Sequence, residues 1–422
     1  MRVMAVGGGG REHAIVKKLL ESSRISHLYA LPGNGGMAGE AECINIAPTD
    51  IDAMVSFAKA RNVDFAVVAP DNPLVSGAVD RLQEAGVRCF GPSAGAAAIE
   101  GSKIYAKGLM QKYGIPTARH KAFDDADKAL DYLSIHDYPA VIKADGLALG
   151  KGVFIAEDMG QAQKAVAALM QEKIFGASGQ RIIIEEYLHG VEVSVLAFTD
   201  GNTIIPMVSA MDHKRAGEGD TGPNTGGMGA IAPNPYYTDE IAAVCTERIF
   251  KPTIDALRSE SRRFKGCIYF GLMLTAQGPK VIEYNCRFGD PETQAVLPLL
   301  ETDLFEIMLV VEEERLDEVQ VKFSGDSVCC VVMASEGYPD KYSTGCPINL
   351  NNAAGMDGIT IFHAGTKLEN GRLFTSGGRV LGVTARAASA AEAVEKAYAA
   401  VDRIEFENAY YRRDIGRSLR RD

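Results

Sequence analysis

Two oxygen-bearing side chains, Glu283 and Asn285, stand two positions apart in the apolar stretch that opens residues 281–294. Side chains alternate along an extended strand, so these two share one face. A carboxylate and an amide oxygen suit Mg²⁺, which completes its octahedron with water and phosphate oxygens. Arg287 is the next residue on that face and adds a fixed positive charge. The pattern predicts a metal site at Glu283 and Asn285 that holds a nucleotide's terminal phosphate. The alternative is a solvated salt bridge at a strand end.

A second stretch, residues 141–153, places a glycine-rich turn between Lys143 and Lys151. Glycines such as Gly146 and Gly152 let backbone amides close around phosphate oxygens, and lysines neutralise charge. The stretch does not match the Walker A loop, because no Ser or Thr follows the second lysine and a strand, not a helix, comes next. It predicts a phosphate-binding loop between two strands. A plain hairpin with surface lysines is the alternative.

A third stretch is an apolar strand that runs into a polar hinge. It carries Glu185, Glu186 and Leu188, and Glu192 follows seven residues after the first of these. Apolar strands that end in glutamates are common, so this segment gains its meaning from its position between the glycine loop and the metal pair.

The N-terminal hundred residues alternate short apolar runs with helical patterns, which predicts a parallel sheet with helices on both faces. Ligands of such sheets bind beyond the carboxyl ends of the strands. The loop at residues 7–10 does not form a dinucleotide-binding fingerprint, because Glu12 and His13 stand where its last glycine would be. It keeps backbone N–H groups at a helix N-terminus, which suit a phosphate. The predicted strands are residues 2–6, 27–30, 64–68 and 87–90, and the predicted helices are residues 11–21, 50–61 and 74–84.

The rest of the chain divides into two further regions. Residues 140–143, 153–156, 181–187 and 191–199 are predicted as strands of an antiparallel subdomain. Residues 211–234 are polar and glycine-rich, and we expect a structureless functional or mobile loop there. The C-terminal region has predicted strands at 328–333, 359–364 and 380–385 and a helix at 389–404, whose capping box is Ser389 and Glu392.

Composition excludes some classes of function. The chain has 422 residues and a net charge of −11, which argues against nucleic-acid binding. It has no run of 18 or more apolar residues, so we expect no membrane association. Its eight cysteines form no CxxC pair, and a reduced, cytoplasmic protein is the expectation. An anionic substrate must then be drawn by local positive groups. No apolar helix stripe stands out, so a monomer is expected.

In their order along the chain, the glycine loop, the hinge and the metal pair resemble the ATP-grasp superfamily. Four further stretches narrow the resemblance to the glycinamide ribonucleotide synthetase family, the phosphoribosylamine–glycine ligases: residues 8–14, 32–36, 212–229 and 287–294. The resemblance implies an N-terminal doubly wound α/β domain (1–101), an ATP-grasp domain (102–324) with a small antiparallel lid at about 122–191, and a C-terminal α+β domain (325–422).

The resemblance also implies a reaction. ATP, with Mg²⁺ or Mn²⁺, phosphorylates glycine, and 5-phosphoribosylamine then attacks the glycyl phosphate to give glycinamide ribonucleotide, ADP and phosphate, in purine biosynthesis. Phosphoryl transfer depends mainly on positioning and charge neutralisation, which falls to Lys143 and Arg287. Asp212 is implied to pair with the glycine ammonium, and Asp290 and Glu292 to orient the amine.

By the same resemblance, catalysis is assigned to Arg287, Lys143, Asp212 and Asp290, and the metal to Glu283 and Asn285. ATP is assigned to Lys103, Lys143, Gly146, Lys151, Gly152, Glu185, Glu186, Leu188 and Glu192. The other two substrates are assigned to Gly9, Gly10, Arg11, Asn34, Gly36, Asp71, Asp212, Lys214, Gly227, Met228, Gly229, Arg287, Asp290 and Glu292.

The sequence departs from the family pattern at two positions. Asp71 stands where a glutamate is usual, and Ala94 follows Ser93 where a lysine is usual. Lys103, and not Lys107, is the expected nucleotide contact on the next helix. Two other readings stay open: an ATP-grasp enzyme that uses formate or bicarbonate, and a non-catalytic nucleotide-binding protein, which should lack the metal pair or the phosphate lysines.

Overall fold

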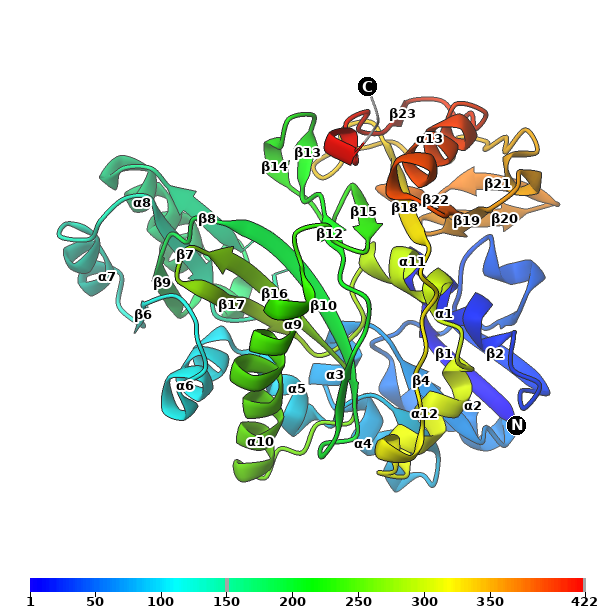
Figure 1. The fold of residues 1–422 in the computed structure, drawn as a ribbon, viewed down its shortest axis with the longest axis horizontal. Helices are drawn as coiled ribbons and strands as arrows, with labels where there is room; N and C mark the ends of the chain where they lie inside the picture. The colour runs from blue at the N-terminus through cyan, green and yellow to red at the C-terminus, as the bar shows by residue number, and fades with distance from the viewer. Residues whose placement is uncertain (149–151, 420–422) are drawn as a thin grey trace.

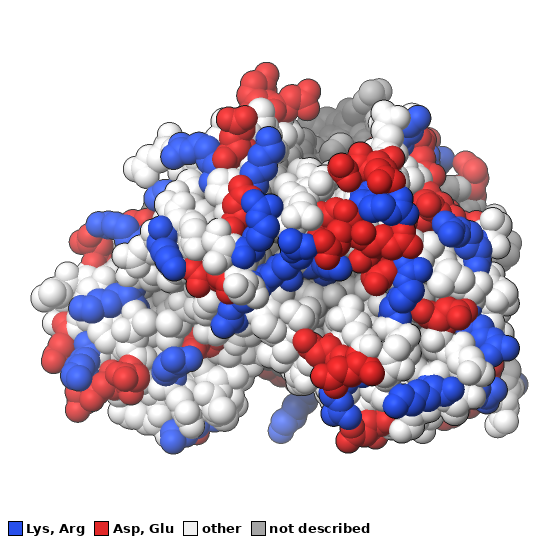
Figure 2. All heavy atoms as spheres, turned by 90° about the horizontal axis from the view of Figure 1, so that it is seen from below, with Lys and Arg blue, Asp and Glu red and all other residues white. Residues whose placement is uncertain are grey.

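The computed structural model describes residues 1–148 and 152–419. Figure 1 shows the N-terminal sheet at the lower right, two antiparallel sheets at the centre and left, and the C-terminal sheet at the upper right. Lys and Arg are interspersed with Asp and Glu on the face in Figure 2. Within the described part of the chain, no helix is long and apolar enough to cross a membrane.

The N-terminal sheet is parallel, in the strand order β3-β2-β1-β4-β5. Val3 and Ala5 of β1 belong to one buried apolar cluster, whereas Met4 and Val6 belong to another. Helices therefore cover both faces, and the predicted doubly wound sheet is confirmed. Its elements are β1 (Arg2–Gly7), α1 (Gly10–Leu19), β2 (His27–Pro32), β3 (Glu42–Cys43), α2 (Ile51–Arg61), β4 (Phe65–Val68), α3 (Asp71–Val75), α4 (Ala78–Glu84) and β5 (Arg88–Phe90).

One predicted helix of this region is wrong in detail. Residues 74–84 do not form one helix, because α3 ends at Val75 and α4 begins at Ala78. Gly77 between them has φ +84°, in the left-handed region that glycine tolerates best. The sequence pattern of apolar residues continued across this break and concealed it.

The central region holds two four-stranded antiparallel sheets, in the orders β11-β10-β16-β17 and β6-β9-β7-β8. The four strands predicted here are present as β7, β8, β9 and β10. The sheets consist of β6 (His120–Phe123), β7 (Ala140–Ala144), β8 (Val153–Ala156), β9 (Ile182–Glu186), β10 (Val191–Thr199), β11 (Ile204–Pro206), β16 (Gly266–Thr275) and β17 (Gly278–Asn285). Their helices are α5 (Ala94–Gly101), α6 (Lys103–Tyr113), α7 (Ala126–Leu133), α8 (Met159–Val166), α9 (Asp239–Cys245) and α10 (Lys251–Ser259).

The segment expected to be structureless, residues 211–234, contains four short strands, so this expectation is wrong. They are β12 (Met211–Asp212), β13 (Arg215–Gly217), β14 (Thr221–Asn224) and β15 (Gly229–Ala232). β12 pairs with β15, and β15 pairs with β18 of the C-terminal region about a hundred residues later. Pairing with a distant strand overrides the weak local β-propensity of this glycine-rich sequence.

The C-terminal sheet runs β12-β15-β18-β22-β19. Its predicted strands and helix are present, and Ser389 Oγ accepts a hydrogen bond from the Glu392 N–H, which confirms Ser389 as the N-cap. The Glu392 carboxylate pairs with Lys396, so the structure shows the Ser389 half of the predicted capping box. The elements are β18 (Ser327–Ser335), β19 (Ile359–His363), β20 (Thr366–Glu369), β21 (Arg372–Thr375), β22 (Arg379–Ala387), α13 (Ala390–Val401) and β23 (Ala409–Tyr410). Because β12 and β15 come from residues 211–232, this sheet includes part of the segment that was expected to be a functional or mobile loop.

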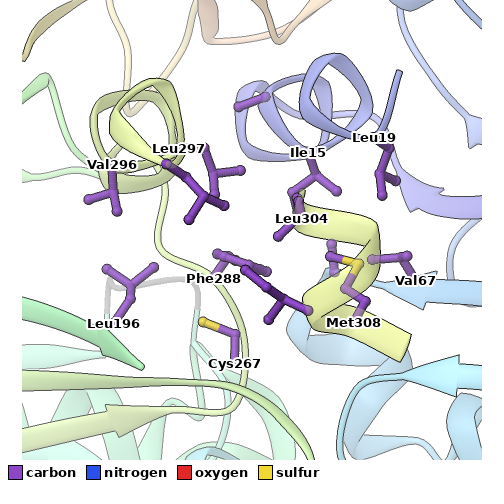
Figure 3. Close-up of a cluster of buried hydrophobic side chains, with 14 of the residues drawn as sticks. Ile15, Leu19, Val67, Leu196, Cys267, Phe288, Val296, Leu297, Leu304 and Met308 are labelled. Carbon is purple, nitrogen blue, oxygen red and sulfur yellow. The ribbon is translucent and has the colours of Figure 1, made fainter. Parts of the chain in front are cut away.

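One apolar core ties these regions together (Figure 3). α11 (Glu292–Val296) and α12 (Leu304–Glu312) place Val296, Leu304 and Met308 beside side chains of α1, β4, β10 and β16. Phe288, directly after Arg287, is buried in the same cluster. Burying one such side chain contributes about 1.5–3 kcal/mol, so this core fixes the backbone next to Arg287.

Candidate active site

A cavity of about 1330 Å³ lies between the two antiparallel sheets and is closed by residues of the N- and C-terminal regions. Most of the site residues predicted from the sequence line it, although they come from segments far apart in the chain. They are Arg11, Asp71, Lys103, Lys143, Gly152, Glu185, Glu186, Leu188, Glu192, Asp212, Lys214, Glu283, Asn285, Arg287, Asp290 and Glu292.

Other predicted residues do not line this cavity. They are Gly9, Gly10, Asn34, Gly36, Gly146, Gly227, Met228 and Gly229. Gly146 stays close to it, because its carbonyl oxygen accepts a hydrogen bond from Lys103 Nζ at 3.0 Å. Met228 is buried and Gly229 belongs to β15. The predicted contact of Lys151 falls outside the described residues.

The predicted metal pair lies at the carboxyl end of β17. Glu283 pairs with Gly271, while Leu272 pairs with Val281, so Ile282 is an extra residue that forms a β-bulge. Bulges next to active sites re-aim side chains. Beyond the bulge, the side chains of Glu283 and Asn285 both line the cavity. The pattern of alternation therefore predicted their shared location correctly.

The charge around Glu283 keeps it ionised. Burial would raise the pKa of Glu283, but nearby Lys214, Lys143 and Lys103 hold it below its usual value. Among residues 1–148 and 152–419, no hydrogen-bond or ion-pair partner of its carboxylate is found. An ionised, unpaired carboxylate beside an amide oxygen fits a hard divalent cation that takes its remaining ligands from water and phosphate.

Arg287 is fixed by partners on two sides. Its guanidinium lies 3.1 Å from Glu100 Oε1 and donates to Asn285 Oδ1 at 3.0 Å and to the Phe288 carbonyl oxygen at 3.1 Å. Glu100 Oε2 also accepts the Cys286 N–H at 2.7 Å. Cys286 itself is buried on the opposite side of the strand, as alternation predicted. Arg287 Nε is buried and has no partner among the described residues.

Two lysines share one carboxylate deep in the cavity. Lys143 Nζ and Lys107 Nζ lie 3.1 and 3.0 Å from Glu185 Oε2. Burial lowers the pKa of Lys107 to about 8, whereas Glu185 opposes this shift. Burial would raise the pKa of Glu185, but the two lysines lower it below its usual value. Lys107 therefore helps to fix Glu185, which in turn holds Lys143. Lys103 and Lys107 both line the cavity, and the preference for Lys103 as the nucleotide contact stays a prediction.

Two side chains hold Glu186, the last residue of β9 before the hinge. Glu186 accepts hydrogen bonds from Arg119 Nε at 2.7 Å and Lys280 Nζ at 3.3 Å. Its backbone N–H donates to the Arg119 carbonyl oxygen. A contact of Glu186 with a base would therefore use its carbonyl oxygen. Further along, Glu192 forms an ion pair with Lys214.

Asp212 is a half-buried carboxyl group of the cavity wall, with one buried oxygen that has no partner among the described residues. Burial and the neighbouring Glu292 raise the pKa of Asp212 well above its usual value. Its Oδ1 has no hydrogen-bond partner among the described residues. Gly227 covers it closely, since a Cβ on this glycine would lie 2.8 Å from Oδ1. A positively charged ligand beside Asp212 would favour its ionised form.

Asp290 lies on the turn that leads into α11, and Glu292 is the first residue of this helix. Arg379 NH2 lies 3.0 Å from Asp290 Oδ2, and Gln294 Nε2 donates to Asp290 Oδ1 at 2.7 Å. Burial would raise the pKa of Asp290, but Arg379 holds it below its usual value. Glu292 Oε1 accepts a hydrogen bond from Ser194 Oγ at 3.0 Å.

The N-terminal loops lie behind Asp290. Arg11 reaches the cavity and donates to the Phe288 carbonyl oxygen at 3.2 Å, but the Gly9 N–H is already used by Glu12 Oε2 at 2.7 Å. Asn34 bridges two loops, because its side-chain amide donates to the carbonyl oxygens of Gly8 and His363 at 3.0 and 2.7 Å. The structure thus gives Asn34 a bridging contact, while its predicted substrate contact stays a prediction.

Sequence reasoning missed several side chains that hold the site together. Glu100 fixes Arg287, Arg379 fixes Asp290, and Arg412 binds Asp220 and the Arg215 carbonyl oxygen at 2.8 and 3.1 Å. Each acts across a distance of many residues, and no local pattern marks it. Lys107 is different, because its position one helical turn after Lys103 was a usable signal in the sequence.

The two antiparallel sheets that enclose a cavity with lysines, a glycine loop and a carboxylate–amide pair define an ATP-grasp protein. The model for the ATP-grasp (A) domain of phosphoribosylglycinamide synthetase matches residues 101–293. The fold agrees with a biotin carboxylase from Campylobacter jejuni solved with an ATP analogue, at TM-score 0.75 and 15% identity over 97% of this chain and 92% of that one.

The other two regions specify the family. Models for the N and C domains of phosphoribosylglycinamide synthetase match residues 1–100 and 328–418. A phosphoribosylamine–glycine ligase of Caldanaerobacter subterraneus is 48% identical over 98% of this chain and 99% of its own. The crystal structure of the Thermotoga maritima ligase has TM-score 0.87 and 32% identity, over 98% of this chain and 100% of that one. The chain belongs to the phosphoribosylglycinamide synthetase family.

Proposed function

We propose that the chain joins glycine to 5-phosphoribosylamine, with ATP converted to ADP and phosphate, to give glycinamide ribonucleotide in purine biosynthesis. The observation that carries this proposal is a single cavity with two groups of residues. Lys143, Glu283 and Arg287 are the group that we assign to the phosphates and the metal, and Asp212 belongs to the loop at residues 212–229, which we call the substrate loop. A nucleotide-binding protein without catalysis has no use for the second group. The family assignment supports the same reaction.

The chemistry starts from a poor electrophile. A glycine carboxylate must accept the γ-phosphoryl group of ATP before an amine can displace its oxygen. We assign Lys143 and Arg287 to offset the negative charge that develops on the transferred group. Both groups are held by buried carboxylates, Glu185 and Glu100, so they need little reorganisation.

We assign the metal to Glu283 and Asn285, as Mg²⁺ or Mn²⁺. When bound, it supplies Lewis-acid neutralisation of phosphate oxygens. The protein's part is to keep Glu283 ionised, through the surrounding lysines, and to orient Asn285 through its hydrogen bond from Arg287.

We assign Asp212 to the glycine ammonium, because its Oδ1 lacks a partner among the described residues and its side chain lines the same cavity. The amine of phosphoribosylamine attacks the acyl carbon, and phosphate leaves with one former carboxylate oxygen. Asp290 and Glu292 are assigned to orient that amine. Water must be excluded, which we assign to residues 143–152 and the loop at 212–229.

The remaining assignments belong to the same proposal. The base is read at Glu186 and Leu188 and the ribose at Glu192, and ribose or phosphate of the second substrate is bound near Gly9–Arg11, Asn34–Gly36 and Asp71. Domain limits at 101/102 and 324/325, a lid at about 122–191, a monomeric state and a cytoplasmic location are proposed with them.

ADP release by the purified protein tests the proposal. MgATP is supplied with glycine, formate or bicarbonate, each with and without 5-phosphoribosylamine. The proposal predicts ADP only with glycine and phosphoribosylamine together, in equal amount to the ligated product. Release with bicarbonate would favour the alternative reaction type. ADP formation that does not depend on glycine would exclude the ligase.

A further inference from the structure

Two side chains of the C-terminal region hold the backbone of Gly226 in the substrate loop. The Gly226 N–H donates to Tyr338 Oη at 3.0 Å, and its carbonyl oxygen accepts from Arg379 NH1 at 2.7 Å. A Cβ on Gly226 would lie 3.0 Å from Arg379 Cζ, so the guanidinium packs directly against this glycine. The loop is therefore held through both the N–H and the carbonyl oxygen of one residue.

The same guanidinium also holds the turn that carries Asp290. Arg379 NH1 donates to the Asp290 carbonyl oxygen at 2.9 Å, and NH2 lies 3.0 Å from Asp290 Oδ2. Planar arginine can satisfy several acceptors in fixed directions, which lysine cannot. One side chain thus connects the substrate loop with the Asp290 turn.

This connection reaches the carboxyl group of Asp212. Gly227 follows Gly226, and its φ of +112° is a backbone conformation that other residues rarely adopt. The Gly227 N–H donates to Thr225 Oγ1 at 2.9 Å, and its α-carbon covers Asp212 Oδ1. A shift of the Gly226 backbone would therefore also displace Gly227, which lies against Asp212 Oδ1.

The support for Arg379 is rigid. Arg379 opens β22, which lies between β18 and β19 in the C-terminal sheet. Val380 and Leu381, the next two residues, are buried in the core of that region. A side chain anchored this way transmits the position of the C-terminal sheet to the cavity wall.

We propose that Arg379, supported by Tyr338, is the positioning residue of the acceptor half of the site, defined as Asp212, the Gly226–Gly227 turn, Asp290 and Glu292. Its contacts set the place of glycine and of the attacking amine, whereas the ATP-binding residues do not depend on it. This inference rests on the proposed function. It gives the C-terminal region a direct part in acceptor binding.

Four variants test it: R379A, R379K, Y338F and the control R386A. Arg386 lies on the same strand and also binds a carboxylate and a backbone carbonyl, at Asp326 Oδ2 (2.7 Å) and the Pro298 carbonyl oxygen (2.9 Å), away from the cavity. For each, kcat, the KM values for ATP, glycine and phosphoribosylamine, and the ratio of ADP to product are measured.

We expect R379A to lower kcat/KM for glycine about 10- to 100-fold, because small misplacements near a reacting group cost this much. Its KM for ATP should stay within about twofold, and ADP should exceed product because water enters. R379K should retain part of the activity and Y338F most of it, both with the same split between glycine and ATP. R386A should match the unaltered protein.

The result that overturns the inference is an R379A that behaves like R386A, or one whose KM for ATP rises in parallel with that for glycine. If R379A does not fold, R379K and Y338F are compared with R386A by the same KM values for glycine and ATP, since both variants keep the bulk of the side chain. Failure of the proposed function is distinguishable, because the unaltered protein would then show no glycine-dependent ADP release.

Discussion

The two halves of the cavity are built differently. The nucleotide half consists of side chains on neighbouring strands, such as Lys143 on β7 and Glu185 on β9, which already pair at 3.1 Å. The acceptor half consists of short elements and turns, namely β12, the Gly226–Gly227 turn and the start of α11, and Arg379 of the C-terminal region holds it partly through backbone carbonyls, as at Gly226. The first half is organised by local sheet geometry, and the second depends on the docking of the C-terminal region.

The largest expected effect comes from Arg287, which lies where the halves meet. R287A should lower kcat about 100- to 1000-fold, as loss of one preorganised donor to developing charge does. Binding of MgATP should persist, because the lysines of the nucleotide half remain. Single-turnover rates with ATP binding measured in parallel check this. Near-normal turnover would remove Arg287 from the mechanism.

Glu283 should rank next. E283Q keeps the shape of the side chain but removes the charge that a divalent cation needs. We expect the Mg²⁺ or Mn²⁺ concentration for half-maximal activity to rise at least about tenfold, since changes around metal ligands commonly cost that much. Excess metal should restore much of the rate. A normal metal titration would contradict the assigned metal site.

Glu100 tests whether the N-terminal region positions the nucleotide half through Arg287. E100Q keeps an acceptor for the Cys286 N–H but loses the charge that holds the guanidinium. We expect kcat to fall about tenfold, with KM for glycine changed less. E306Q is the matched control, because the Glu306–Arg24 pair also joins two regions but is exposed. Such surface pairs contribute little, and equal effects of both variants would contradict the role of Glu100.

The smallest effect concerns stability behind the acceptor half, where His13 Nδ1 accepts the His363 N–H at 2.7 Å. Burial and the neighbouring His13 lower the pKa of His363 to about 3 from 6.5. Between these pH values the unfolded chain binds a proton that the folded chain does not. The free energy of unfolding should therefore fall as pH falls through this window, by at most about 1.4 kcal/mol per pH unit.

Denaturant unfolding between pH 7 and pH 4 measures this slope. In H363F the ring remains but cannot titrate, so we expect the slope to be shallower than in the unaltered protein. H27F is the control, because His27 also lies at one end of a strand, β2 of the N-terminal region, but its side chain is exposed. Identical slopes in H363F and the unaltered protein would show that the pH dependence of the unfolding free energy comes from other groups.

The same contrast explains what could be predicted from the sequence. The pair Glu283 and Asn285 and the lysine loop depend on strand alternation and on glycine spacing, which are local, and the structure brings them to one cavity. The family resemblance singled out residues 212–229 as one segment, and its role in substrate binding stays a prediction. It could not reveal that residues 211–232 contribute β12 and β15 to the C-terminal sheet, because their partner strand lies far along the chain.

The contacts of Arg379, Glu100 and Asn34 were not predictable for the same physical reason. Each side chain is unremarkable in its own segment, and its role arises only when two distant segments meet. The expected substrate glycines Gly9, Gly10 and Gly36 are packed against other residues, since a Cβ on Gly36 would lie 2.4 Å from the His363 ring. Close packing in the fold thus accounts for these glycines without a ligand.

Transfer of carboxylate oxygen to phosphate tests the central claim most directly, because it requires both halves to act on one glycine. Glycine labelled with ¹⁸O in its carboxylate is incubated with the protein, MgATP and 5-phosphoribosylamine, and the phosphate released is analysed by mass spectrometry. A glycyl phosphate intermediate predicts one labelled oxygen in each phosphate formed with product. Unlabelled phosphate alongside the ligated product would contradict the account.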